Sequence, residues 1–210
     1  MGLDQYLRPK FRDLKDSLTP KVEAIVKDLG PYIESTEVPP WLVDKIKDLK
    51  IDGCLSRAPE YGAIGCNFLE GNALLFEICK QDVCLDGFIG VSWALGTEVI
   101  EFCGNEEQKK RMLSDCIKFN KITSFALSEP KFGSDATSLE TFAVKATDGR
   151  DGWILNGQKR WIGHAAIADY IVVWAKNKDE GNKIQGFVVE KGSPGLKIEK
   201  IKGKLSLRIL

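Results

Sequence analysis

Residues 117–128 read IKFNKITSFALS, and the hydrophobic pattern of the sequence changes within this stretch. Before it, apolar residues recur every three or four positions, which is typical of amphipathic helices. After it, short β-branched and aromatic runs alternate with clusters of Gly, Asn, Asp and Pro, which is typical of strands and turns. The sequence therefore predicts an α+β chain, with an all-α helical domain over residues 1–120 and an antiparallel, barrel-like β domain over residues 121–210.

Glycine, proline and capping residues delimit the helices of the first part. Thr19-Pro20 and Gly30-Pro31 predict the start and the end of one helix, because proline suits the first helical position and interrupts a helix interior. Further helices are expected over residues 40–49, 67–80 and 88–102. Asn105 predicts the N-cap of a last helix, with Gln108 at its capping-box position. The inner face of that helix is expected to hold Met112, Leu113, Cys116 and Ile117.

Strands are expected in six runs of the second part: ITSFAL, TFAVKA, WILNG, YIVVWA, IQGFVVE and LKIEKI. Asn156-Gly157 predicts a tight turn between Trp153–Leu155 and a strand over Lys159–Ile162. The last residues, SLRIL, have the pattern of an apolar edge strand. This abrupt ending favours a fragment or a truncated product over an ordinary edge strand.

Composition excludes several classes of protein. Thirty Lys and Arg balance thirty Asp and Glu, so the net charge of zero gives no reason to expect nucleic acid as a partner. Apolar runs such as Tyr170–Ala175 are too short to cross a bilayer, and no membrane association or N-terminal targeting signal is predicted. Six cysteines without C-x-x-C spacing and a single histidine predict buried thiols in a reducing compartment and no metal site.

Two segments have residues suited to binding chemistry, FALSEPKFGSD (125–135) and GQKRWIGHAAIA (157–168). Gly133 lets a backbone approach a phosphate closely, and the hydroxyl of Ser134 is a donor beside it. Trp161 is able to present a flat face to an aromatic ligand. Each segment also has an ordinary structural interpretation, as a simple turn for Gly133 and Ser134 and as a core residue for Trp161.

Together, the two segments resemble the middle β domain of the acyl-CoA dehydrogenase and acyl-CoA oxidase superfamily. The resemblance rests on FALSEPKFGSDATSLE, GWILNGQKRWIG, ADYIVVWA, GFVVEKGSPGL and KIKGKLSLR, with CGNEEQKKRML in the helical part. It covers residues 20–210 and is closest to the short-chain acyl-CoA oxidases and the glutaryl-CoA dehydrogenases. It includes only the N-terminal and middle domains of that family, without its C-terminal helical domain.

The resemblance implies FAD as cofactor, no metal, and oxidation of an acyl-CoA to the trans-2-enoyl-CoA in fatty-acid β-oxidation. It also implies homo-oligomers, dimers or tetramers, for full-length members. The matching cofactor-binding positions are Phe125, Ala126, Leu127, Ser128, Gly133, Ser134, Trp161, Ile162 and Gly163. Ser134 also matches a position near the CoA chain, and Ser128 matches a hydroxyl at the pyrimidine edge of the flavin.

Departures from the family pattern qualify this expectation. The catalytic Glu of the family lies in the C-terminal domain, so no residue here is assigned as base and the chain alone is expected to be inactive. Gly163 replaces a Thr of the dehydrogenases, which favours an oxidase with room for oxygen beside the flavin. Asp86 aligns with an Arg of glutaryl-CoA dehydrogenases, which makes glutaryl-CoA a less favoured substrate. Glu129 is expected to be a turn residue, and His164 a loop histidine bonded to backbone.

Two other interpretations stay open. A non-catalytic relative would keep the fold as a binding or assembly module, and a plain structural domain would make the family match accidental. For an enzyme of this family, the expected location is the peroxisome, or alternatively the mitochondrial matrix.

Overall fold

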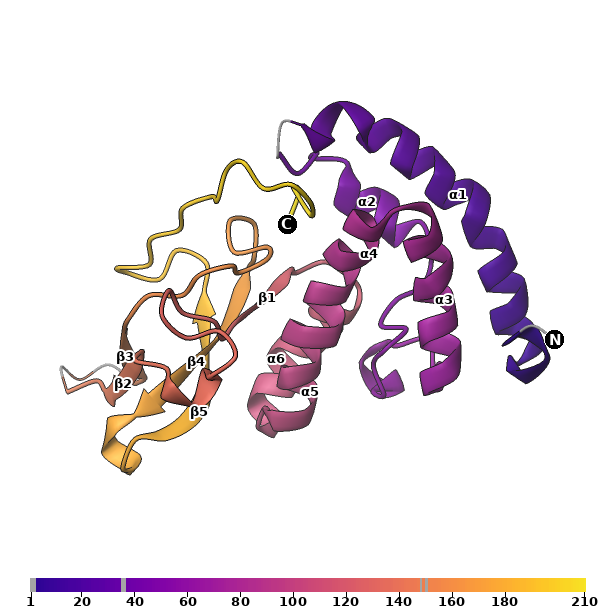
Figure 1. Cartoon of the computed structure of the whole chain (residues 1–210). Coiled ribbons are helices and arrows are strands. Elements are labelled where there is room, and N and C mark those ends of the chain that lie inside the picture. Colours follow the sequence, from indigo (N-terminus) through magenta and orange to yellow (C-terminus); the bar gives the residue numbers. More distant parts are fainter. Residues whose placement is uncertain (1–2, 35–36, 148, 150) are drawn as a thin grey trace.

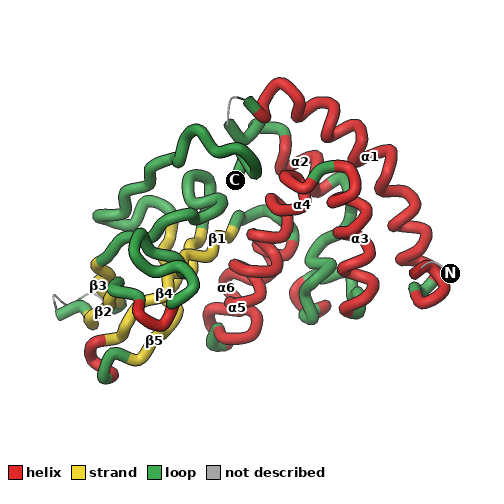
Figure 2. The backbone as a smooth tube through the Cα atoms, viewed as in Figure 1, coloured by secondary structure: helices red, strands yellow, loops and turns green. Residues whose placement is uncertain are grey.

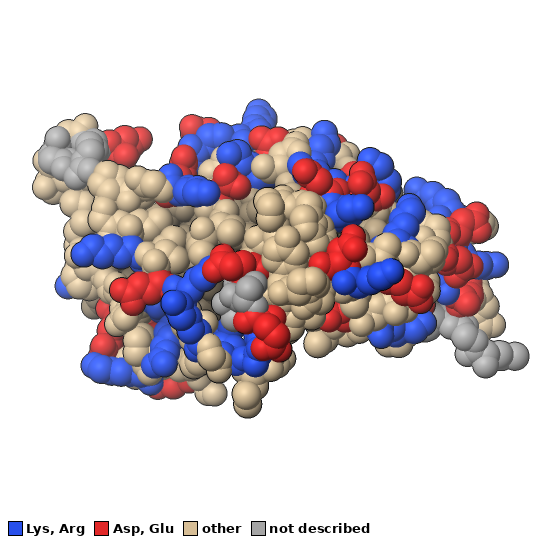
Figure 3. Space-filling model, turned by 90° about the horizontal axis from the view of Figure 1, so that it is seen from above, with Lys and Arg blue, Asp and Glu red and all other residues tan. Residues whose placement is uncertain are grey.

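The computed structural model describes residues 3–34, 37–147, 149 and 151–210. A group of helices comes first along the chain, one sheet follows, and a tail without regular structure returns from the sheet to the helices (Figures 1 and 2). The order of a helical part and a sheet part is as predicted. Acidic and basic side chains are interspersed over the face seen from above, in keeping with the balanced charge (Figure 3).

The helices are α1 (Pro9–Ile33), α2 (Leu42–Lys47), α3 (Phe68–Gln81), α4 (Val83–Gly90), α5 (Glu98–Cys103) and α6 (Glu106–Ile117), with a π-helical segment (Val91–Thr97) joining α4 to α5. The predicted cap of α6 is confirmed, because Asn105 and Gln108 form a reciprocal capping box. Its predicted inner face is also confirmed, since Met112, Leu113, Cys116 and Ile117 are fully buried. A second capping box, between Asn67 and Glu70, begins α3.

Helix α1 differs from its prediction, because it neither begins at Thr19-Pro20 nor ends at Gly30-Pro31. It runs unbroken from Pro9 to Ile33 and includes both prolines. The buried residues of its inner face stay in phase on both sides of Pro20: Phe11, Leu18, Val22, Ile25 and Leu29. Packing of this continuous apolar face against the helical core therefore outweighs the hydrogen bond that Pro20 removes.

The continuous helical stretch Val83–Cys103 is, among the described residues, the one helix long and apolar enough to cross a membrane by length and composition. The sequence prediction considered only shorter runs and missed it. Half of its most apolar window is buried in the protein, and Phe88, Ile89 and Trp93 belong to the main helical core. Burial as a central helix accounts for this hydrophobicity.

This central helix also holds the first strand in place. Thr123 Oγ1 donates a 2.6 Å hydrogen bond to the carbonyl oxygen of Ser92, and its hydroxyl lies 3.1 Å from that of Thr97. Gly96 faces the same threonine so closely that a Cβ at this position would lie 2.4 Å from Thr123 Oγ1. The π-helical segment is thus fitted directly against the start of the sheet.

The sheet contains β1 (Thr123–Ala126), β2 (Phe142–Lys145), β3 (Trp153–Asn156), β4 (Tyr170–Asn177) and β5 (Lys183–Glu190). Strand β4 is central: β5 pairs along its whole length, while β1 and β2 pair with its first and last residues. The β1 and β2 pairings with β4 are parallel, and the other two pairings are antiparallel. The sheet is therefore mixed, which corrects the prediction of a purely antiparallel one.

Three segments predicted as strands are not strands. Residues 159–162 form no strand after β3, because the backbone of Arg160 and the side chain of Lys159 bond to the exit of β1 instead of continuing a hairpin. The LKIEKI run at 196–201 and the SLRIL run at 206–210 lie in the tail, outside the sheet. Ile209 is buried among the helices, so the apolar side chains of the tail serve contacts other than strand pairing.

Candidate functional site

The two segments singled out in the sequence are bonded to each other. The backbone N–H of Arg160 donates a 2.9 Å hydrogen bond to the carbonyl oxygen of Ser128, just after β1. Four residues earlier, within β1, Ser124 Oγ donates a 2.6 Å hydrogen bond to the carbonyl oxygen of Gly163. These bonds place the loop of Trp161 directly against the exit of β1, so the two motifs form one site.

A buried ion pair reinforces this junction. Lys159 Nζ donates 2.9 Å hydrogen bonds to Glu129 Oε1 and to the carbonyl oxygen of Leu127. Glu129 also accepts hydrogen bonds from the backbone N–H groups of Glu140 and Thr141. Burial alone would raise the pKa of Glu129, but these donors lower it to about 2, so the carboxylate is charged. Glu129 is thus a structural residue, which agrees with the prediction of a turn position.

The loop around Trp161 has an unusual backbone. Trp161 and His164 have φ angles of 63° and 64°, in the left-handed region that residues other than glycine seldom adopt. The indole of Trp161 is 61% exposed, with the Arg160 guanidinium 5.0 Å from its ring centroid. Backbone strain held beside an exposed aromatic face is typical of a binding site.

Gly163 fits closely against the central helix. A Cβ built on Gly163 would lie 3.2 Å from Cγ1 of Val91. The contact explains the glycine by packing, because a larger residue would push against Val91.

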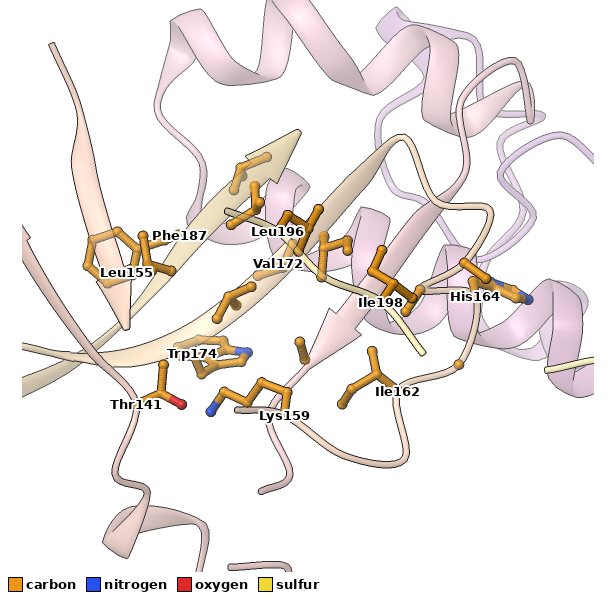
Figure 4. A pocket seen from close by; sticks show the side chains of 18 of the residues that line it. Thr141, Leu155, Lys159, Ile162, His164, Val172, Trp174, Phe187, Leu196 and Ile198 are labelled. Atoms are coloured by element: carbon orange, nitrogen blue, oxygen red, sulfur yellow. The ribbon is translucent and has the colours of Figure 1, made fainter. Parts of the chain in front are cut away.

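A cleft of about 2270 Å³ opens beside this loop, between the sheet, the central helix and the tail. Its wall includes Val91, Ala126, residues 152–167 and most of the tail (Figure 4). Pockets for drug-sized ligands hold about 300–1000 Å³, so the cleft has room for a large cofactor together with a second ligand. Its lining contains a single carboxylate, Glu199, among the described residues, against seven basic side chains: Arg111, Lys159, Arg160, Lys197, Lys200, Lys204 and Arg208.

The predicted site residues fall into three groups. Ala126, Trp161, Ile162 and Gly163 line the cleft. The others on the first segment, Phe125, Leu127 and Ser128, lie next to that wall, with the ring of Phe125 edge-on to Trp174 at 6.1 Å. Gly133 and Ser134 are exposed on the following loop and are not among the residues that line the cleft, so their phosphate-binding role stays a prediction.

Two residues of the site escaped the sequence analysis, and a third, His164, lies on the expected loop but in a more buried environment. Lys159 was passed over although it follows the Asn-Gly turn, and Val91 had no signal beyond its place on a helix. His164 was expected on a loop with backbone hydrogen bonds, but its ring is 3% exposed and packs on Phe88 with the centroids 4.2 Å apart. Neither ring nitrogen makes a hydrogen bond of ordinary geometry to the described residues, and the Thr123 backbone faces the ring.

Asp86 lies away from the lining of the cleft, so its predicted place near a distal substrate carboxylate stays a prediction. Its carboxyl is half buried beside the thiol of Cys79 on α3, and it is not among the residues lining the cleft. Burial raises the pKa of Asp86, whereas the Cys79 hydrogen bond opposes the rise. The charge argument against a dicarboxylic substrate therefore has no support from the geometry.

The residues present fit a flat aromatic cofactor that carries phosphates. Trp161 offers an open indole face, and Trp174 Nε1 on the cleft wall is a buried donor without a partner among the described residues. Figure 4 shows Trp174, Thr141 and Lys159 gathered at one end of the cleft, with His164 at the opposite end. Four of the seven basic side chains are ion-paired to glutamates outside the lining: Arg111, Lys159, Lys200 and Arg208. The positive charge that suits a diphosphate therefore comes from Arg160 and Lys197, while the apolar wall at Val91 and Ile162 suits an aromatic ring or an acyl chain.

Comparison with known proteins gives consistent matches. The model of the acyl-CoA dehydrogenase N-terminal domain matches residues 10–120, and that of the acyl-CoA dehydrogenase middle domain matches residues 124–210. A probable short/branched chain specific acyl-CoA dehydrogenase of Dictyostelium discoideum is 33% identical over 190 residues, which is 90% of this chain and 44% of that protein.

Solved structures give similar matches. A glutaryl-CoA dehydrogenase from Mycobacterium smegmatis, in complex with FADH2, has a TM-score of 0.82 at 32% identity and covers 98% of this chain and 51% of its own. The butyryl-CoA dehydrogenase of Megasphaera elsdenii has a TM-score of 0.85 at 25% identity, over 97% of this chain and 54% of its own. This chain therefore spans about half the length of these relatives.

Proposed function

This chain belongs to the acyl-CoA dehydrogenase family, and from that premise we propose that it binds FAD in the cleft and holds an acyl-CoA beside the flavin. The proposed reaction of the whole protein is oxidation of the acyl-CoA to the trans-2-enoyl-CoA. The observation that carries the proposal is the bonding of the Ser128 segment to the Trp161 loop at the wall of a cleft rich in basic side chains. That arrangement offers an aromatic face, hydrogen-bond donors and positive charge within one concave surface.

The chemistry divides between the cofactor and the protein. When bound, the flavin supplies the acceptor for a hydride from the β-carbon, while a carboxylate base takes the α-proton. In this proposal Trp161 packs on the ring, Ser128 and nearby amides bond its polar edge, and Ala126, Ile162 and Gly163 complete the wall. Basic side chains such as Lys197 and Arg160 offset the phosphate charges. Holding the thioester beside the ring supplies rate by positioning.

We assign no catalytic base in this chain. Glu129 is committed to Lys159, and Glu199 is exposed on the tail. The proposal is therefore that these 210 residues bind both ligands and do not turn the substrate over unaided. In the relatives' family the base belongs to the C-terminal helical domain, as the sequence resemblance implies.

Flavin absorbance tests the proposal. Purified protein should carry flavin colour or acquire it on addition of FAD, and the colour should persist when butyryl-CoA is added anaerobically. Bleaching by butyryl-CoA would show that the chain contains a working base and would overturn the assignment of none. Protein that stays colourless with excess FAD would favour the alternative, a binding or assembly module that keeps the fold without the cofactor.

The electron acceptor and the substrate are further parts of the proposal. The reported relatives are dehydrogenases, so we favour a dehydrogenase over an oxidase. A whole protein that releases peroxide under air in step with substrate would reverse that preference. Glutaryl-CoA stays a candidate beside unbranched acyl-CoAs, because Asp86 does not line the cleft. Imaging the tagged protein would decide between peroxisome and mitochondrial matrix.

A further inference from the structure

The tail is fastened at both ends. Near the sheet, Leu196 packs with Ala126 and Ile171, while at the far end Ile209 is 2% exposed within the helical core. The segment between them, residues 197–210, is called the strap below. In Figures 1 and 2 it leaves the sheet and arches over to the helices, where it reaches the region of α2 and α4.

Polar contacts fix the far half of the strap. Arg208 pairs with Glu34 at the end of α1, and Lys204 Nζ donates hydrogen bonds of 2.7 and 2.6 Å to the backbone oxygens of Leu207 and Leu210. The backbone of Arg208 and Ile209 lies against the thiol of Cys84, which is 8% exposed. The last turn of the strap is thus folded upon itself and seated on α4.

The seated end stands at the edge of the cleft. A Cβ built on Gly87 would lie 3.1 Å from Leu210 Cδ1 and 3.5 Å from Leu207 Cδ2. Val91 lies one helical turn further on, on the same face of the helix, and its Cγ1 would lie 3.2 Å from a Cβ built on Gly163. Leu207, Leu210 and Val91 all line the cleft. An apolar wall therefore runs from the Trp161 loop along the helix and ends at the two leucines.

We infer that the strap closes this end of the cleft and that Leu207 and Leu210 limit the length of the acyl chain. The inference rests on the proposed function, which holds an acyl-CoA beside the flavin, and it adds that the acyl chain lies along the apolar wall at Val91. Each methylene buried along this wall should strengthen binding by about fourfold. The side chains of Leu207 and Leu210 occupy the space beyond this wall. Further methylenes of a long acyl chain should therefore add no affinity or should lower it.

Calorimetric titration of the FAD-loaded chain with butyryl-, octanoyl- and lauroyl-CoA tests this. In the wild-type protein the affinity should stop rising within this series. Combined Leu207→Ala and Leu210→Ala substitution should raise the affinity for lauroyl-CoA relative to butyryl-CoA by at least about tenfold, because the stop is removed. The matched control is Leu205→Ala, since Leu205 is 95% exposed on the same strap and should leave the profile unchanged. A double variant with the wild-type profile would overturn the inference.

A second variant works in the opposite direction. Leu207→Phe places a larger side chain at the closed end of the cleft, at a residue that is 39% exposed. It should weaken the binding of octanoyl-CoA and leave the binding of butyryl-CoA unchanged. Unchanged octanoyl-CoA affinity would count against the inference. In every variant, slow reaction of Cys84 with a thiol reagent reports that the strap is still seated, measured in a background in which the partly or fully exposed Cys66, Cys79 and Cys103 are replaced by Ser. Failure of all three acyl-CoAs to bind the wild type would reject the proposed function itself, and the inference with it.

Discussion

Glu129 Oε1 and Lys159 Nζ lie 2.9 Å apart, in a place where the two side chains are only 4% and 10% exposed. The pair links the segment after β1 to the loop that carries Trp161. Two charges taken out of water cost free energy, and their mutual attraction offsets the cost only when both remain and further hydrogen bonds satisfy them. Here the backbone of Glu140 and Thr141 and the carbonyl of Leu127 supply those bonds. The pair therefore defines the geometry of the site.

Breaking the pair from one side should be costly. Glu129→Gln leaves Lys159 charged and buried without its partner, so we expect the free energy of unfolding to fall by about 3 kcal/mol in urea titrations. Adding Lys159→Met should recover part of the loss, because it removes the uncompensated charge. The matched control is Glu140→Gln, whose pair with Lys131 is solvent-exposed and should matter little. Equal stabilities of the two single variants would show that the buried pair is not structural.

Two glycines of the central helix should respond in opposite ways to alanine. Gly96→Ala places a Cβ 2.4 Å from Thr123 Oγ1 and 3.1 Å from the backbone nitrogen of Ser124, so the helix and β1 must separate. We expect a loss of about 3 kcal/mol or more. Gly90→Ala meets nothing within 4 Å and should stabilise the helix by about 0.5–1 kcal/mol. Thermal unfolding of the two variants measures both, and a stable Gly96→Ala protein would contradict the close contact.

The sequence was most informative where the signal is local. The capping box of Asn105 and Gln108 and the inner face of α6 depend on residues three or four apart, so they were predictable. The course of α1 was not, because Thr19-Pro20 looks the same at a helix start and inside a helix. Only packing of the residues on both sides of Pro20 decides between them.

In the candidate site, too, the local motifs were predictable and the contacts between distant residues were not. The Ser128 and Trp161 segments were recognisable as motifs, and their hydrogen bond places them together. The partners that adjust them come from elsewhere in the chain: Val91 lies about 70 positions before Gly163 and touches it only through the tertiary fold. The parallel pairing of β1 with β4 is equally non-local, since it joins strands separated by β2 and β3. No short-range pattern encodes such contacts.

Trp161 should contribute to FAD binding and little to folding. Its side chain is 61% exposed, so Trp161→Ala should leave the free energy of unfolding nearly unchanged. Loss of the indole face should lower the affinity for FAD by about tenfold, as measured by quenching of flavin emission. Phe102→Ala is the control, because Phe102 is 56% exposed and is not among the residues lining the cleft. An unaltered FAD affinity in Trp161→Ala would place the flavin elsewhere.

The single histidine should give the protein a distinct pH dependence. His164 is buried against Phe88, and burial lowers its pKa from 6.5 to about 4, although the Thr123 backbone opposes the shift. In the unfolded chain the imidazole takes up a proton near pH 6.5, whereas the folded protein does so only near pH 4. The unfolded state thus binds more protons in this interval, and stability is complete above pH 6.5 and falls as the pH drops toward 4. The total loss is up to about 3 kcal/mol.

The ion-paired glutamates affect stability at lower pH than His164 does, so the two contributions can be measured separately. Glu70 and Glu129 have pKa values of about 2 against an ordinary 4.5, so their contribution is complete above pH 4.5 and is lost only below it. Burial raises the pKa of Asp52, Asp86 and Glu98, so these carboxyls contribute a rise in stability as the pH falls. A fall between pH 6.5 and 4.5 therefore belongs to His164. Replacing it by Phe removes the titrating group and keeps a ring on Phe88, so His164→Phe should flatten urea-derived stability across that interval. A variant that keeps the wild-type slope there would show that the histidine is not the group responsible.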